Sequence, residues 1–152
     1  MFLYRISRAA YARDLSGEGS RRFGGRWNKK GVPVIYTSAH QSLAALEVLA
    51  HVPVTSIPED LQLIILKVPD TAETEQILTS DLPEGWQAYP APDKLAEIGT
   101  NWAKWGEGLL LQVPSVIIPD EFNFLINPLH EEARKIEIHA VRDFQFDKRI
   151  FS

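Results

Sequence analysis

A single carboxylate stands out because it lies among apolar residues at helical spacing. At about 100° per residue, Glu47 falls on the same stripe of a helix as Leu43 and Leu46. An unpaired carboxylate is costly to bury, so such a residue is usually paired or lines a cleft. We therefore expect Glu47 to line a cleft. The alternative is an inward-facing Glu that pairs with an arginine for structural reasons only.

The segment 23–28, Phe-Gly-Gly-Arg-Trp-Asn, is the second candidate. Glycine allows a ligand to approach the backbone closely, and an arginine fork suits a phosphate or a carboxylate. We expect Arg26 to act in an anion site, with Gly25 allowing close approach of the ligand. A hairpin turn with an exposed arginine is the alternative.

Two hydroxyl-bearing residues complete the candidate site. Tyr36 lies in a β-branched run just before the Glu47 helix, where core packing and ligand stacking are both open. Ser115 follows Pro114 at an interrupted strand, which could aim its hydroxyl into a cleft or serve the backbone alone. No His or Lys stands near Ser115 in a motif that would activate it as a nucleophile.

Basic residues gather at the start of the chain. The first thirty residues hold eight Arg and Lys against Asp14 and Glu18, a net charge of +6. The whole chain carries −4, so the other 122 residues carry −10. The overall charge argues against direct nucleic-acid binding. A local basic segment suits a compact anion such as a pyrophosphate, and a solvated basic surface that faces an acidic partner is the alternative.

The composition excludes several kinds of site. The chain has 152 residues and no cysteine, so disulfide scaffolds, zinc–thiolate sites and thiol nucleophiles are ruled out. The sequence contains no P-loop and no HExxH motif. Its four histidines lack ligand spacing, so we expect no metal. They are His40, His51, His130 and His139.

The apolar stretches are short. The longest, 63–66 and 109–111, fall far below the roughly 20 residues of a membrane-spanning helix. The N-terminus reads Met-Phe-Leu-Tyr-Arg, without a charged leader before an apolar core, so no signal peptide is expected. We expect a cytoplasmic protein with no membrane partner.

Strands must position most of these residues. The pattern predicts two helices, 39–51 capped by Ser38 and 93–105 ended by Gly106, with Leu95, Trp102 and Trp105 facing the core. It predicts a loop over 16–28, and a mostly irregular segment over 71–92 with one helical turn near 74–78. The predicted strands are 2–6, 33–37, 61–68, 109–113, 115–118, 122–126 and 136–141. In the last strand, alternation places Ile136, Ile138 and Ala140 on one face. Because strands outnumber helices without regular alternation, we predict a single α+β domain over residues 1–152.

Six motifs in this order resemble the RES-domain family, from Tyr4 to about Phe144. That family takes its name from an Arg, a Glu and a Ser, which match Arg26, Glu47 and Ser115 here. The six motifs are Tyr4-Arg5, Gly24-Gly25-Arg26-Trp27-Asn28, Ile35-Tyr36-Thr37-Ser38, Leu43-Ala44-Ala45-Leu46-Glu47, Leu111-Gln112-Val113-Pro114-Ser115 and Ile126-Asn127-Pro128.

The resemblance implies a toxin of a bacterial toxin–antitoxin pair, encoded beside an Xre-type helix-turn-helix antitoxin. It implies a split β core with peripheral helices around an NAD cleft, similar to the ADP-ribosyltransferase fold. The implied activity is NAD+ glycohydrolysis, with mono-ADP-ribosylation of a protein, or non-catalytic binding of a nucleotide or the antitoxin, as alternatives. NAD+ would be the substrate, with no further cofactor, and a homo-oligomer stays open.

The resemblance also implies roles for the site residues. Glu47 would stabilise the positive charge that develops on the ribose, and Arg26 would hold the pyrophosphate or ribose. Tyr36 would stack on nicotinamide, and Ser115 would bind its carboxamide or the ribose. The residues expected to contact substrate are Gly25, Trp27 and Asn127.

Overall fold

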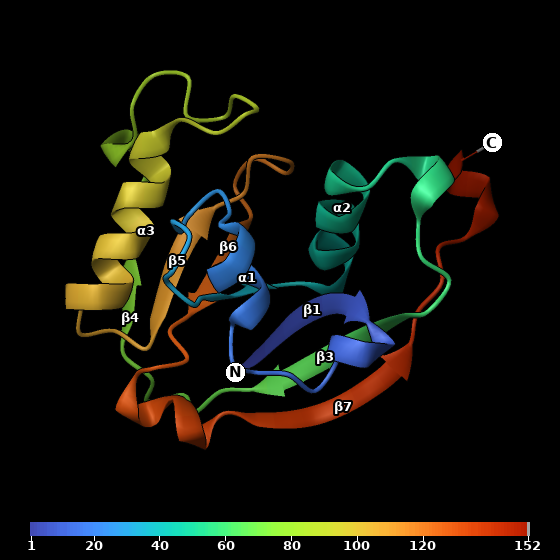
Figure 1. The fold of residues 1–152 in the computed structure, drawn as a ribbon, viewed down its shortest axis with the longest axis horizontal. Helices are drawn as coiled ribbons and strands as arrows, with labels where there is room; N and C mark the ends of the chain where they lie inside the picture. The colour runs from blue at the N-terminus through green and yellow to red at the C-terminus, as the bar shows by residue number, and fades with distance from the viewer. Residues whose placement is uncertain (152) are drawn as a thin grey trace.

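Seven strands form one mixed sheet in the computed structural model, which describes residues 1–151 (Figure 1). Their order across the sheet is β4-β5-β6-β2-β1-β3-β7, with β4 parallel to β5 and every other neighbouring pair antiparallel. The α+β class is therefore confirmed. The strands are β1 (Phe2–Arg8), β2 (Ile35–Ser38), β3 (Leu61–Lys67), β4 (Thr74–Gln76), β5 (Leu110–Pro114), β6 (Phe122–Ile126) and β7 (Glu137–Asp143).

The sheet is split between β1 and β2. These strands are joined by one register pair, Tyr4 with Ser38, whereas β1 pairs with β3 along its whole length. Beyond that pair the strands diverge, so Arg5 on β1 and Tyr36 on β2 face a gap that no ladder closes. The predicted split β core is confirmed, and the split makes room for a site.

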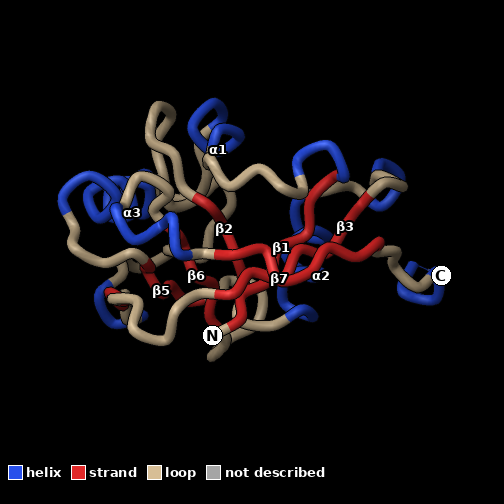
Figure 2. The backbone as a smooth tube through the Cα atoms, turned by 90° about the horizontal axis from the view of Figure 1, so that it is seen from below, coloured by secondary structure: helices blue, strands red, loops and turns tan. Residues whose placement is uncertain are grey.

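Three helices surround the sheet (Figure 2). They are α1 (Glu18–Phe23), α2 (Gln41–His51) and α3 (Asp93–Trp105). Helix α2 contacts β1 and β2, so it lies beside the split. Short 3-10 turns connect the elements at Ala9–Tyr11, Val54–Ser56, Thr79–Asp81, Glu131–Lys135 and Lys148–Phe151.

Two apolar clusters form the core. One lies around Leu3, Ile64 and Leu66, under β1 and β3. The other packs α3 on β5 and β6, through residues that include Trp27, Trp86, Leu95, Trp102, Leu111 and Leu125. Helix α3 comes so close to the loop that a Cβ at Gly99 would collide with the backbone carbonyl of Trp27. This contact fixes the backbone next to Arg26.

Three predictions made from local sequence pattern were wrong, at places where long-range contacts decide the structure. The predicted loop 16–28 contains α1, which Ser20 anchors: its hydroxyl donates to the Val34 carbonyl (2.5 Å) and accepts from the Val34 amide (2.9 Å). The predicted helical turn at 74–78 instead contains the whole of β4, which pairs with β5. Residues 115–118 are not a strand, because Ser115 turns the chain after β5.

Two further details differ at element ends. Ser38 ends β2, and His40 stands at the N-cap of α2 with no side-chain cap. A register shift opposite Ile65 leaves His139 unpaired in β7, so Ile138 and Val141 pack on the same core and the predicted alternation fails there. In α3, Leu95 and Trp102 are buried as predicted, but Trp105 is exposed because the helix ends at that residue.

No helix within residues 1–151 is long and apolar enough to cross a membrane. In the same range, no group of three or more His, Asp and Glu side chains is arranged to hold a metal ion.

Candidate functional site

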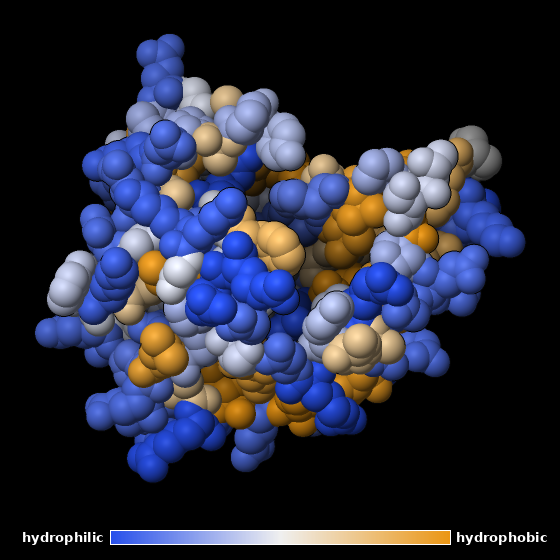
Figure 3. Space-filling model, viewed as in Figure 1, coloured by the Kyte–Doolittle hydropathy of each residue, from blue (hydrophilic) through white to orange (hydrophobic). Residues whose placement is uncertain are grey.

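A cavity of about 660 Å³ opens where β1 and β2 diverge. We call it the Glu47 cavity. One wall is apolar and comes largely from α2 and the segment after it, with Val48, Val52 and Leu61. In the space-filling view the hollow lies between α1 and α2, and its apolar wall is orange (Figure 3). The polar wall includes Arg5, Arg26, Tyr36, Glu47 and Asn123.

Glu47 is held by one of its two carboxylate oxygens. The amide nitrogen of Asn123 donates to Glu47 Oε1 at 2.7 Å, and the Ser115 hydroxyl donates to the same oxygen at 3.4 Å. The Ser38 hydroxyl in turn donates to Asn123 Oδ1 at 2.7 Å, which turns the amide nitrogen toward Glu47. Residues of β2, of β6 and of the turn after β5 therefore form one hydrogen-bond network that ends on a carboxylate of α2.

The other carboxylate oxygen, Oε2, accepts no hydrogen bond from residues 1–151, and Glu47 forms no ion pair in that range. Arg26 in particular does not pair with it. The interpretation that Glu47 faces inward only to pair with an arginine is therefore wrong. A carboxylate held on one side and open to a cavity on the other is available to a ligand.

Arg26 spans the cavity rim. Its guanidinium donates from Nη1 to the Trp86 carbonyl (2.9 Å) and from Nη2 to the Ala88 carbonyl (3.2 Å). Burial lowers the pKa of Arg26, and the nearby Glu47 carboxylate partly opposes this effect. Two of the five N–H donors are used in these bonds, so three are not engaged by them.

Tyr36 ties the glycine-rich loop to the sheet. Its hydroxyl donates to Asn28 Oδ1 (2.5 Å) and accepts from the Trp27 amide (3.1 Å). A Cβ at Gly25 would lie 2.7 Å from this hydroxyl, so glycine is needed for the contact. Burial raises the pKa of Tyr36 well above its usual value, which favours the neutral phenol further. The ring itself lines the cavity.

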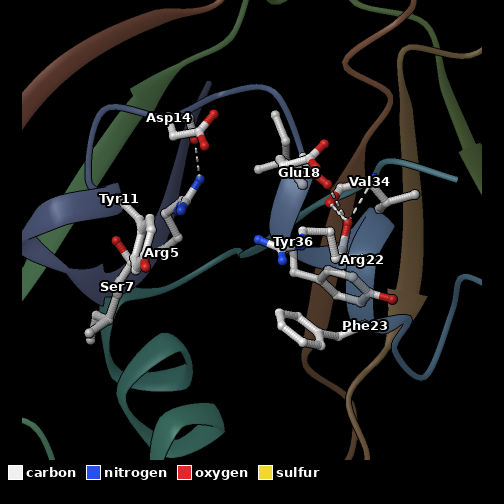
Figure 4. A pocket seen from close by; sticks show the side chains of 14 residues that line it. Arg5, Ser7, Tyr11, Asp14, Glu18, Arg22, Phe23, Val34 and Tyr36 are labelled. Atoms are coloured by element: carbon white, nitrogen blue, oxygen red, sulfur yellow. Dashed lines mark hydrogen bonds between the residues drawn. The ribbon is translucent and has the colours of Figure 1, made fainter. Parts of the chain in front are cut away.

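Arg5 is a site residue that our functional reading of the sequence missed. It lies on β1 beside the split and donates one hydrogen bond, from Nη1 to the Asp14 carbonyl at 3.0 Å (Figure 4). Burial lowers the pKa of its guanidinium, because a half-buried cation lacks full solvation. Alternation along β1 would have placed Arg5 on the face of buried Leu3, next to the split.

Asn123 was missed as well. It stands in strand β6 between Phe122 and Phe124, and β pairing places it beside Ser38. A lone amide in an apolar strand is the available signal, but the partner strand cannot be read from local sequence.

The predicted site residues do not all line the cavity. Gly25, Arg26, Tyr36 and Glu47 line the Glu47 cavity together. Ser115 is 4% exposed, and its hydroxyl also accepts from the amides of Ile117 and Ile118, so it reaches the site only through Glu47.

Of the two remaining predicted residues, Trp27 lies at the cavity wall and Asn127 does not. Trp27 contributes to the cavity wall, but the residue is 3% exposed and belongs to the α3 cluster. Asn127 is absent from the cavity lining. It donates to the Ala103 carbonyl (3.0 Å) and accepts from the Leu129 amide (3.0 Å), which pins the turn after β6 to α3.

The arrangement joins an open carboxylate to two arginines across one cavity. Such a site can bind an anionic ligand through the guanidinium groups while the carboxylate faces an electron-poor centre. A protonated tyrosine ring adds a flat apolar surface.

The sequence matches the RES domain over residues 2–148. It is 40% identical over 146 residues to the Prs ADP-ribosylating toxin of Sphingobium sp. (strain YBL2), covering 95% of this chain and 91% of that protein. It is 39% identical over 153 residues to Toxin Res of Pseudomonas putida, covering 99% and 100% of the two chains.

The fold is also similar to a solved structure. A chain in the crystal structure of the M. tuberculosis MbcT–MbcA toxin–antitoxin complex superposes with a TM-score of 0.72 at 21% identity, over 95% of this chain and 84% of that chain. The match of nearly the whole sequence and the identity to named toxins agree with this likeness in fold. The two relatives compared are named toxins, and the chain belongs to the RES-domain family.

Proposed function

We propose that this protein is the toxin of a toxin–antitoxin pair and cleaves the nicotinamide–ribose bond of NAD+, with water as the acceptor. The observation that carries the proposal is the open Oε2 of Glu47 in a cavity that also holds Arg5 and Arg26. NAD+ combines a pyrophosphate with a positively charged nicotinamide ring. The arginines can bind the pyrophosphate, and the carboxylate can face the positive charge.

The chemistry requires little acid–base work. The bond between ribose C1′ and the nicotinamide nitrogen breaks, and its electron pair neutralises the pyridinium, so nicotinamide leaves without a proton. The ribose ring becomes cationic, as in glycoside hydrolysis. A water oxygen then bonds to C1′ and loses a proton to solvent, which gives ADP-ribose.

Each residue has a place in this reaction. Glu47 Oε2 would face the cationic ribose and its hydroxyls, while Asn123 and Ser115 hold the other oxygen still. Arg5 and Arg26 would bind the pyrophosphate with their remaining donors. Tyr36 would offer its ring to nicotinamide.

The test is incubation of the purified protein with NAD+ labelled on the adenine, followed by measurement of free nicotinamide, free ADP-ribose and labelled protein. Equal release of nicotinamide and ADP-ribose is the expected result. Trp105→Leu, a substitution at an exposed residue outside the cavity lining, should release both products at the wild-type rate. Absence of nicotinamide release from folded protein would refute the proposal.

Transfer of ADP-ribose to a protein is a second candidate, favoured by one observation. The Sphingobium relative, 40% identical over nearly its whole length, is named an ADP-ribosylating toxin. The bond that breaks is the same, and only the acceptor differs. Nicotinamide release with label on an added protein, and little free ADP-ribose, would favour transfer over hydrolysis.

We also propose a cognate antitoxin, of the Xre helix-turn-helix type, as the protein partner. The structural neighbour was solved in complex with an antitoxin. The basic segment from Arg5 to Lys30 borders the cavity and suits an acidic antitoxin segment. Titration of the Glu47→Gln variant with antitoxin, with and without saturating NAD+, tests competition. Weaker antitoxin binding with NAD+ is expected, and unchanged binding would place the antitoxin elsewhere.

A further inference from the structure

A second cavity, of about 470 Å³, adjoins the Glu47 cavity. We call it the Arg22 cavity. The two share a wall that includes Arg5, Phe23 and Tyr36, so they are compartments of one cleft. Figure 4 shows the Arg22 cavity with Arg5, Tyr11 and Asp14 on one side, and Arg22, Phe23 and Tyr36 on the other. None of the roles in NAD+ cleavage proposed above uses Tyr11, Arg22 or Phe23.

The acidic groups of the Arg22 cavity are already engaged. Glu18 accepts two hydrogen bonds from Arg21, at 2.6 and 2.7 Å. The Asp14 carboxylate accepts from the Ser16 amide at 2.8 Å. Neither carboxylate forms an ion pair with the arginines of the cavity.

The arginines of this cavity retain free donors. Within residues 1–151, Arg22 makes no hydrogen bond or ion pair, and its guanidinium lies 5.7 Å from the centre of the Phe23 ring. Arg5 makes the one bond to the Asp14 carbonyl. By contrast Arg8 pairs with Asp60, and Arg21 with Glu18. Two guanidinium groups are therefore left for an anion.

Exposed aromatic rings stand on opposite walls. Phe23 is 74% exposed at the end of α1, and Tyr11 is 60% exposed in the turn after β1. An exposed phenyl ring at a cavity wall gains most from a flat apolar partner, and nucleobases stack well on such rings. A flat ring attached to a phosphate would meet both the aromatic side chains and the arginines.

We propose that the Arg22 cavity binds the adenosine monophosphate half of NAD+, with adenine on Phe23 and the adjacent phosphate between Arg22 and Arg5. This inference rests on the proposed function, since it orients the same substrate. The nicotinamide ribose then lies in the Glu47 cavity, and Arg5, which lines both compartments, lies at the pyrophosphate.

The variants Phe23→Leu and Arg22→Gln test this orientation, with Trp105→Leu and Lys30→Gln as controls outside both linings. All four side chains are exposed, so unchanged melting temperatures are expected. Binding of AMP by calorimetry should weaken about tenfold in either test variant and in neither control, from the loss of a stacked ring or a charged contact. AMP should also compete with NAD+. The variant Phe23→Tyr, which keeps an aromatic ring, should bind AMP with about the wild-type affinity.

Substrate truncation separates this inference from the proposed function. Nicotinamide mononucleotide lacks the adenosine monophosphate half, and Arg22 lines the Arg22 cavity but not the Glu47 cavity. Arg22→Gln should therefore raise the KM for NAD+ about tenfold, with kcat unchanged, and leave cleavage of the mononucleotide unaltered. An equal effect on both substrates, no effect on either, or AMP binding that does not compete with NAD+ would overturn the orientation. Failure of wild-type protein to cleave NAD+ would instead refute the proposed function.

Discussion

Asn123 and Asn127 lie four residues apart at the two ends of β6, and their hydrogen bonds end on different kinds of group. Asn127 bonds the Ala103 carbonyl and the Leu129 amide, so its partners are all backbone. Asn123 lies between the Ser38 hydroxyl and the Glu47 carboxylate, so its partners are all side chains. The first network closes a turn, whereas the second leaves an oxygen open to a cavity. The groups at which a hydrogen-bond network ends therefore indicate its role better than the residue type does.

We expect the largest loss of activity from a substitution at Glu47, where the Asn123 network ends. Glu47→Gln keeps the shape of the side chain but removes the charge that stabilises a cationic ribose. We expect nicotinamide release to fall by about 100-fold or more, as for loss of a main electrostatic stabiliser. The melting temperature should stay near that of the wild type, since Glu47 forms no ion pair in residues 1–151. A near-normal rate would make Glu47 a packing residue.

Asn123→Ala should show the next largest effect on the rate. It removes the shortest hydrogen bond to Glu47 Oε1, which leaves the carboxylate less well oriented. A hydrogen bond to a charged group contributes roughly 1.5–3 kcal/mol, so a loss of about tenfold or more in kcat is expected. Fixed-time assays of nicotinamide release measure kcat, and an unchanged kcat would show that Asn123 has no part in the site.

Asn127→Ala should give the opposite pattern. The substitution leaves the Leu129 amide and the Ala103 carbonyl without a side-chain partner, so stability should fall by about 1–3 kcal/mol. Because Asn127 does not line the cavity, kcat measured below the melting transition should match the wild type. Urea unfolding gives the stability. A rate defect in protein that is still folded would instead return Asn127 to the substrate site, as the family resemblance implied.

Ser115→Ala should lower both the stability and the rate, each by a small amount. Its hydroxyl caps the turn at Ile117 and Ile118 and lies 3.4 Å from Glu47, a long hydrogen bond. We expect a loss of about 1 kcal/mol in stability and a rate loss of a few fold, smaller than for Asn123→Ala. The same two assays measure these effects. A rate loss above that of Asn123→Ala would indicate direct contact of Ser115 with substrate.

The sequence predicted features that depend on local pattern. Helical spacing placed Glu47 on an inward stripe, and α3 was predicted with its observed bounds because apolar residues recur at helical spacing up to Gly106. The split sheet, by contrast, came from the family resemblance, because the single Tyr4–Ser38 pair depends on strands far apart in the chain.

The residues that complete the site could not be predicted in this way. Asn123 reaches Glu47 only because β6 pairs with β2, and Arg5 faces the cavity only because β1 diverges from β2. Arg26 was predicted at an anion site, but two of its donors bind carbonyls about 60 residues away in the chain. Strand register and long-range hydrogen bonds leave no periodic signal in a single sequence.

The central claim is that Asn123 acts through Glu47, and a double-mutant cycle tests it most directly. Single-turnover release of nicotinamide from NAD+ would be measured for wild type, Asn123→Ala, Glu47→Ala and the double variant. We predict that Asn123→Ala costs about tenfold in the wild-type background and less than about twofold when Glu47 is already absent. Equal losses in the two backgrounds would show that Asn123 and Glu47 act independently, and would contradict the account.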